Sequence, residues 1–101
     1  TVYRMCTMSL LNVYYKAKPG MREEFFKAVN ELKVPEMSRA EEGNMKYDYY
    51  FSDADPDELL LIEHWKDQEA FEIHCGTEHF KSLGAVKEKY LVGTDLNKIE
   101  C

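Results

Sequence analysis

Residues 44–65, NMKYDYYFSDADPDELLLIEHW, decide the fold of this chain of 101 residues. The first part, NMKYDYYFSD (44–53), alternates in side-chain character, which is typical of a strand. Its more apolar face carries Met45, Tyr47, Tyr49 and Phe51. The segment DADPDE (53–58) consists of turn formers. A second strand, ELLLIEHW (58–65), follows it and places on one face Leu59, Leu61, Glu63 and Trp65. Two strands around such a turn predict an antiparallel β-hairpin.

A strand and a helix precede this hairpin. The segment MSLLNVYYKAKPG (8–20) reads as a strand that ends at Lys18-Pro19-Gly20, and apolar side chains occupy both of its faces. The segment MREEFFKAVNELKVPEMSRAEEG (21–43) has apolar residues at helical spacing. We expect Pro35 to bend or interrupt this helix, a further turn to follow it, and Gly43 to end it.

Two helices and a last strand follow the hairpin. Asp67 can cap a helix whose inner face holds Ala70, Phe71 and His74. Gly76 breaks that helix, and Thr77 can cap the next one. Four side chains align along the second helix, namely Phe80, Leu83, Val86 and Tyr90. Gly93 is expected to end it, and TDLNKIE (94–100) is the last strand.

This order of elements predicts one domain, residues 1–101, with an α+β fold, the ferredoxin-like βαββαβ sandwich. Helices cover only one face of such a sheet, yet the strands carry apolar residues on both faces. We therefore expect the second face to pack against the same face of another copy, which gives a symmetric homodimer.

Composition narrows the class of protein. The net charge is −6, and no segment concentrates Lys and Arg, so we expect no nucleic-acid partner. No apolar run is long enough for a signal peptide or a membrane span. The three cysteines are an odd number without a CxxC motif, which argues against a disulfide framework and a zinc knuckle. Reduced cysteines predict a cytoplasmic protein.

Three segments together resemble a known family: KPGMREEFFKAVNEL, RAEEGNMKYDYYFSDADPDELLLIEHWKDQEAFEIH and TEHFKSL. They resemble the antibiotic biosynthesis monooxygenase (ABM) domains of the dimeric α/β-barrel superfamily, over residues 8–92. The resemblance implies a homodimer whose two sheets form a barrel, with a cavity between sheet and helices in each subunit. Several members oxidise phenolic or quinol-type aromatics with O2 and use neither metal nor flavin. Others bind or degrade haem, or isomerise a small phosphorylated metabolite.

His74 is the candidate general base. Its place on the inner helix face directs it toward the sheet, and desolvation lowers the proton affinity of an imidazole there. Such a histidine can accept a proton near neutral pH. The alternative is a core histidine that is satisfied by a backbone carbonyl or by Glu63. The resemblance places a histidine at this point beside the ligand cavity.

Asn12 is the second catalytic candidate, because it interrupts an apolar strand and a buried amide needs partners. In the family that the chain resembles, a first-strand asparagine can hydrogen-bond a substrate oxygen or a peroxide. A slip of one residue would turn Asn12 to the other face of the sheet.

Five further residues are candidates for binding a small planar aromatic ligand: Trp65, Tyr47, Tyr49, Glu63 and His79. The aromatic rings can form a pocket wall that supplies hydroxyl donors, or simply fill the core. Glu63 can orient a histidine or accept a proton, or it can pair with a lysine or a tyrosine hydroxyl. His79 can also be a helix cap or a surface residue.

We expect no metal site and no cofactor. His74 and His79 are five positions apart, about 140° off a shared helix face, although a break at Gly76 weakens this objection. His64 points from a strand, away from Trp65.

The predicted function is a cofactor-independent monooxygenase, an oxidoreductase acting on a small phenol or hydroquinone. A non-catalytic dimeric ligand-binding or stress-related module and an isomerase of a phosphorylated metabolite remain alternatives. The isomerase would need a cationic anchor such as Lys16 or Lys46.

Overall fold

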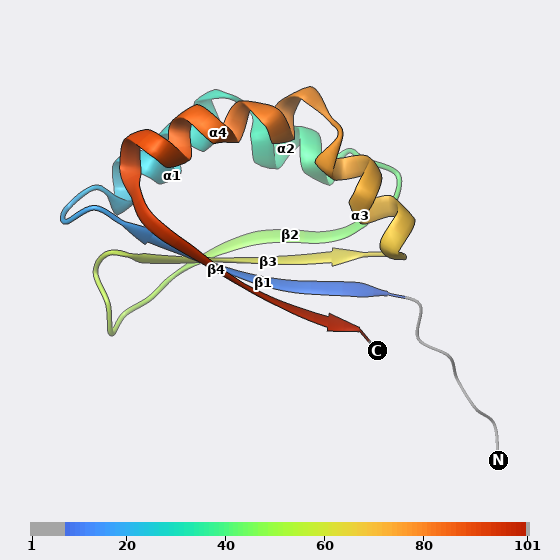
Figure 1. Ribbon diagram of the computed structural model, residues 1–101, viewed down its shortest axis with the longest axis horizontal. Helices are drawn as coiled ribbons and strands as arrows, with labels where there is room; N and C mark the ends of the chain where they lie inside the picture. The colour runs from blue at the N-terminus through green and yellow to red at the C-terminus, as the bar shows by residue number, and fades with distance from the viewer. Residues whose placement is uncertain (1–7, 101) are drawn as a thin grey trace, which may run out of the picture.

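The computed structural model describes residues 8–100, which form four strands and four helices. In chain order these are β1 (Ser9–Ala17), α1 (Arg22–Glu31), α2 (Val34–Arg39), β2 (Asn44–Phe51), β3 (Glu58–Trp65), α3 (Gln68–Cys75), α4 (Glu78–Tyr90) and β4 (Leu91–Glu100). The strands make one antiparallel sheet in the order β2-β3-β1-β4. The helices all lie over the same face of that sheet (Figure 1). The predicted ferredoxin-like α+β fold is confirmed.

The core lies between the sheet and the helices. Alternate residues of β1 and β3 are buried, as the alternating sequence predicts. The inner face of β1 contributes Leu11, Val13, Tyr15 and Ala17, and that of β3 contributes Leu59, Leu61, Glu63 and Trp65. The helices cover them with apolar side chains that include Phe25, Val29, Val34 and Leu83. Burial of these groups is the main stabilising term of the fold.

The predicted interruption before Pro35 is also confirmed. α1 ends at Glu31, and Lys33 has a φ of 59°, the left-handed conformation that stops a helix. α2 then begins at Val34, with Pro35 in its first turn, where a missing N–H is tolerated. The chain turns here so that residues 40–43 reach the end of the sheet beside α3.

Two predicted caps set the position of α3 and α4. The Asp67 side chain accepts a hydrogen bond from the N–H of Ala70 at 2.8 Å, and that of Thr77 accepts one from Phe80 at 3.2 Å. Gly76 ends α3, as expected. The helical direction therefore changes between His74 and His79.

Three local expectations are corrected. Met45 does not share the buried face of Tyr47, because a bulge between Asn44 and Lys46 shifts the register and leaves Met45 60% exposed. The helix before the hairpin ends at Arg39, ahead of Gly43, whose missing side chain instead admits Ala70: a Cβ there would lie 2.3 Å from the Ala70 Cβ. Likewise α4 ends at Tyr90, and Gly93 lies inside β4.

The second face of the sheet has no helix over it (Figure 1). Its apolar members Leu10, Tyr14, Leu60 and Ile62 are only half-buried.

Among residues 8–100, none of the helices has the length and apolar character that crossing a bilayer requires. Cys75 is a free thiol. Cys6 and Cys101, which also entered the prediction of reduced cysteines, lie outside the described residues.

Candidate functional site

His74 lies at the centre of the interior, with its side chain 1% exposed. It projects from the last turn of α3 toward the sheet. The Trp65 ring lies against it with centroids 4.5 Å apart, and Phe80 packs edge-on at 5.2 Å. Tyr47 and Phe71 complete the aromatic surroundings at 5.9 and 6.4 Å. Burial lowers the pKa of His74, although the Glu41 carboxylate opposes this shift. The surroundings of the imidazole, aromatic rings beside the Glu41 carboxylate, therefore favour its neutral form.

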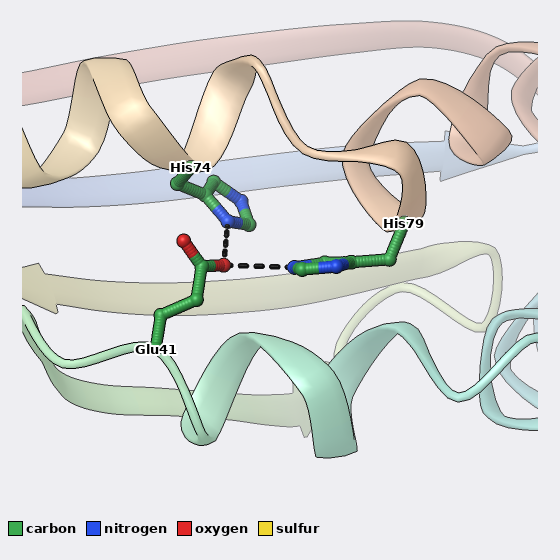
Figure 2. Close-up of side chains that lie close together, drawn as sticks. All are labelled: Glu41, His74 and His79. Carbon is green, nitrogen blue, oxygen red and sulfur yellow. Dashed lines mark hydrogen bonds and ion pairs between the residues drawn. The ribbon is translucent and has the colours of Figure 1, made fainter.

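One carboxylate oxygen joins both histidines of the α3–α4 region (Figure 2). Oε2 of Glu41, in the loop between α2 and β2, lies 2.6 Å from Nδ1 of His74 and 2.8 Å from Nε2 of His79. The side chains of Glu41 and His79 are 14% and 12% exposed. Oε1 of Glu41 is buried and has no hydrogen-bond partner. The cluster Glu41, His74 and His79 is thus a compact polar group beneath the helices.

Glu63 approaches His74 from the sheet. Its Oε1 accepts a hydrogen bond from Nε1 of Trp65 at 3.0 Å and lies 3.8 Å from Nε2 of His74. Burial raises the pKa of Glu63 to about 7, against the opposing effect of the Trp65 hydrogen bond. The two ring nitrogens of His74 therefore face two different carboxylates.

This arrangement fixes the tautomer of His74. The neutral imidazole donates through Nδ1 to the Glu41 carboxylate, which leaves the lone pair on Nε2. Nε2 then faces Oε1 of Glu63 at 3.8 Å, and Glu63, whose pKa burial raises to about 7, is partly protonated near neutral pH. A proton on Glu63 satisfies this contact, and a bound hydroxyl donates its single proton to Nε2 only when the two side chains move apart.

Three tyrosines and a lysine extend the polar interior. Burial raises the pKa values of Tyr15, Tyr47 and Tyr49 well above their usual range, so their hydroxyls stay protonated and can donate. Nζ of Lys87, from α4, lies over the Tyr15 ring, 5.5 Å from its centroid. Burial lowers the pKa of Lys87, and the Glu63 charge counteracts this.

A pocket of about 400 Å³ opens beside this interior, at the end of the sheet. Four of its nine lining residues are acidic, and the lining consists of Glu41, Glu42, Gly43, Lys66, Asp67, Glu69, Ala70, Ile73 and Thr77. Glu41 belongs both to the pocket lining and to the cluster with the histidines. Its carboxylate therefore connects the solvent side to His74.

Comparison with known proteins places these features in a family. The model of the antibiotic biosynthesis monooxygenase family matches residues 8–85, which include the hairpin, Glu63, Trp65 and both histidines of the cluster. The chain belongs to this family. The ABM relative named "Putative monooxygenase YcnE", from Bacillus subtilis strain 168, is 37% identical over 92 residues, which are 91% of this chain and 94% of the relative.

Solved structures agree on the ABM fold. The structure of PA3566 from Pseudomonas aeruginosa is 30% identical, with a TM-score of 0.83, and the match covers 98% of both chains. A structure from Nitrosomonas europaea, titled "Putative antibiotic biosynthesis monooxygenase", has a TM-score of 0.86, with 99% of this chain and 95% of that one covered. Its 24% identity supports the likeness of fold alone.

Most of the predicted site residues of this ABM protein come together. The inner face of the sheet, against which His74 of α3 packs, carries Trp65, Tyr47, Tyr49 and Glu63. Asn12 does not join them. It pairs with Ile62 and Asn97 on the opposite sheet face, because the inner positions of β1 fall to Leu11 and Val13. The predicted pairing of Asn12 with His74 in one site is therefore wrong within one chain.

Two further corrections concern the histidine cluster. The expected divergence of His74 and His79 is wrong, since the break at Gly76 lets both imidazoles reach Glu41. His79 is consequently neither a cap nor a surface residue.

Glu41 itself was missed, because a glutamate in a polar loop gives no periodic signal. Lys87 was missed because only lysines on strands were considered, and Lys16 and Lys46 pair with Asp55 and Asp48 instead.

Proposed function

We propose that this ABM-family protein is a monooxygenase that oxidises a small phenol or hydroquinone with O2, without flavin or metal in the reaction. One observation carries the proposal. Nε2 of the neutral, buried His74 faces Glu63 at 3.8 Å inside an enclosure of aromatic rings. A phenolic hydroxyl can donate its one proton to Nε2 of His74, and its ring suits aromatic walls.

The residues have separate tasks in this proposal. His74 accepts the phenolic proton at Nε2, while Glu41 holds Nδ1–H and stabilises the imidazolium that forms. The hydroxyls of Tyr47 and Tyr49 donate to the developing negative charge on oxygen. Trp65 and Phe80 enclose the ring and exclude water. The side chains around His74 must separate to admit the substrate, since the imidazole is 1% exposed.

The reaction balances with O2 as the only oxidant. The phenolate transfers one electron to O2, and the semiquinone and superoxide radicals join to form a C–O bond. Protonation gives a hydroperoxide. Loss of the proton on that carbon with cleavage of the O–O bond releases one water and leaves a carbonyl. A hydroquinone and one O2 thus become a hydroxyquinone and one H2O, and the substrate supplies all four electrons.

The direct test is O2 consumption with a panel of hydroquinones in the presence of a chelator. We expect the wild-type protein to exceed the buffer rate and His74→Ala to lose about 10²–10⁴-fold, the usual contribution of a general base. His64→Ala is the matched control, because His64 lies on the opposite sheet face. If wild-type protein consumes O2 no faster than buffer with every member of the panel, the proposal is wrong.

We also propose that the protein works as a homodimer. Leu10, Tyr14, Leu60 and Ile62 form an apolar row on the sheet face that the helices leave open. A second copy of the same face would cover this row with matching side chains. Asn12, in the middle of this face, would then lie at the interface.

A second candidate is the isomerase of a small phosphorylated metabolite, and Lys87 is the observation that favours it. Its ammonium lies between the Tyr15 and Phe80 rings, 5.5 and 6.0 Å from their centroids, and could anchor an anionic group. Lys87→Met separates the two candidates. Loss of phosphate-ester binding with O2 consumption retained would favour the isomerase site, and the reverse would favour the oxidation.

A further inference from the structure

We infer that Glu41, His74 and His79 form a binding site for one divalent transition-metal ion, with Zn²⁺ as the representative ligand. The three donor atoms, Oε2 of Glu41, Nδ1 of His74 and Nε2 of His79, all lie within 4.8 Å of one another. Two imidazole nitrogens and one carboxylate oxygen are ligands that Zn²⁺ commonly takes in proteins. Three protein ligands leave a fourth position for water.

The geometry requires only a small expansion. In the hydrogen-bonded state, Oε2 lies 2.6 and 2.8 Å from the two nitrogens. Ligands at about 2.0–2.1 Å in a tetrahedral arrangement are about 3.3 Å apart, so Oε2 must move roughly 0.5–0.7 Å away from each of the two nitrogens. The ion would replace the two N–H protons that now lie between these atoms. Since Glu41 comes from a loop and the histidines from two different helices, this shift disrupts no single element.

Glu41 carries a second, independent indication. Its other oxygen, Oε1, is buried and has no hydrogen-bond partner. A buried unpartnered carboxylate oxygen is costly, because it has lost its water without a replacement. Coordination through Oε1, or through both oxygens, would satisfy it. The orphaned atom thus points to a positively charged group beside Glu41.

The surroundings of His74 supply the outer partner that metal-bound histidines require. A histidine that ligates through Nδ1 keeps its proton on Nε2, and that proton normally goes to a carboxylate or carbonyl. Here Oε1 of Glu63 lies 3.8 Å from Nε2 of His74. Trp65 holds this oxygen in place by a hydrogen bond of 3.0 Å. Glu63 is therefore positioned to orient the ligand.

A cation has a route to the site. Glu41 also lines the pocket of about 400 Å³, where Glu42, Asp67 and Glu69 outnumber the one cation, Lys66. An acidic opening concentrates cations near it. The net charge of −6 acts in the same direction. The ion would enter past Thr77 and meet Glu41 first.

This inference does not rest on the proposed oxidation. Metal binding is measured without substrate, whereas O2 consumption is measured with a chelator, so either can fail alone. If both hold, the ion removes the hydrogen bond between His74 and Glu41 and gives a metal-bound form that is inactive in the oxidation.

The test is titration of the tag-free full chain with Zn²⁺ by calorimetry, after removal of metals with a chelator. Cys6, Cys75 and Cys101 are first replaced by serine, so that no thiol binds the ion. Co²⁺ is used in parallel because its visible absorption reports the coordination geometry. We expect one ion per chain, a tetrahedral Co²⁺ spectrum and a raised unfolding temperature.

Variants decide whether the ion occupies this cluster. Glu41→Gln and His79→Gln each should weaken Zn²⁺ binding by more than about 100-fold, since loss of an outer partner alone costs 10–100-fold. His64→Gln, on the opposite sheet face, should leave it unchanged. Circular dichroism checks that each variant folds. If Glu41→Gln does not fold, the result for His79→Gln decides alone. Absence of binding by the folded chain, or equal binding by His79→Gln, overturns the inference.

Discussion

His74 and His79 meet at one oxygen of Glu41, although the two histidines belong to different helices. Gly76 and Thr77 separate α3 from α4, so the second helix begins in a new direction. The buried carboxylate thereby fastens the α2–β2 loop to both helices (Figure 2). The same contact fixes the tautomer of His74, which links the packing of the loop to the chemistry of the site.

Glu41→Gln should lower the free energy of unfolding by about 1–3 kcal/mol, because it weakens two hydrogen bonds to a buried charged acceptor. Urea denaturation in the presence of a chelator measures the effect. Glu42→Gln is the matched control, since its side chain is 93% exposed, and we expect a change below about 0.5 kcal/mol. Equal effects of the two substitutions would show that Glu41 does not fasten the loop.

Gly43→Ala should destabilise the fold by about 1–3 kcal/mol, because the new Cβ would lie 2.3 Å from that of Ala70 and force α3 away from the loop. Gly84→Ala, within α4, is the control. A Cβ there has nothing within 4 Å, and alanine favours a helix over glycine by about 1 kcal/mol. Thermal and urea unfolding should therefore give opposite signs for the two substitutions, and a stabilised Gly43→Ala would contradict the close approach of α3.

The sequence was sufficient for the architecture because its signals are periodic. Alternation in β1 and β3 predicts which side chains are buried, and the capping residues Asp67 and Thr77 predict where α3 and α4 begin. The errors fall where one local interaction outweighs the pattern. The bulge in β2 turns Met45 to solvent, and Gly43 serves the approach of Ala70 rather than a helix end.

The site residues that could be predicted are those on the strands and helices that the periodic pattern identifies. His74, Glu63 and Trp65 lie on faces that periodicity determines, so their meeting could be anticipated. Asn12 was predicted to act with His74 because the polarity of a strand residue does not reveal which face the helices cover. Glu41 comes from a loop, where no period exists to place it. Its contact with His79 depends on the angle between two helices, which is a tertiary property.

Alkaline pH should destabilise the protein through its buried tyrosines. Burial raises the pKa values of Tyr15, Tyr47 and Tyr49 above their value in the unfolded chain, which is about 10. Their contribution to stability is therefore complete below about pH 10. Above it, the unfolded state releases protons first, and each such tyrosine costs up to about 1.4 kcal/mol per pH unit.

Tyrosinate absorbance and urea unfolding between about pH 9 and about pH 11.5 measure this effect. We expect these three tyrosines to ionise together with unfolding, and Tyr47→Phe to reduce the loss of stability with pH. If tyrosinate absorbance reaches the value for all seven tyrosines of the chain while the protein is still folded, the burial argument fails.

Ile62→Lys should convert the proposed homodimer into a folded monomer. Ile62 lies on the open face of β3, between Asn12 on β1 and Asp48 on β2. A lysine there can pair with Asp48 in the monomer, but it would bring a charge into an apolar interface. We expect the dissociation constant to rise by more than about 100-fold, which corresponds to about 2.7 kcal/mol. Analytical ultracentrifugation measures it. Ile73→Lys is the control, since Ile73 is 60% exposed on α3, a helix that lies over the other face of the sheet (Figure 1). A wild-type protein that sediments as a monomer at all concentrations, or a dimer that Ile62→Lys leaves intact, would show that this face is not the interface.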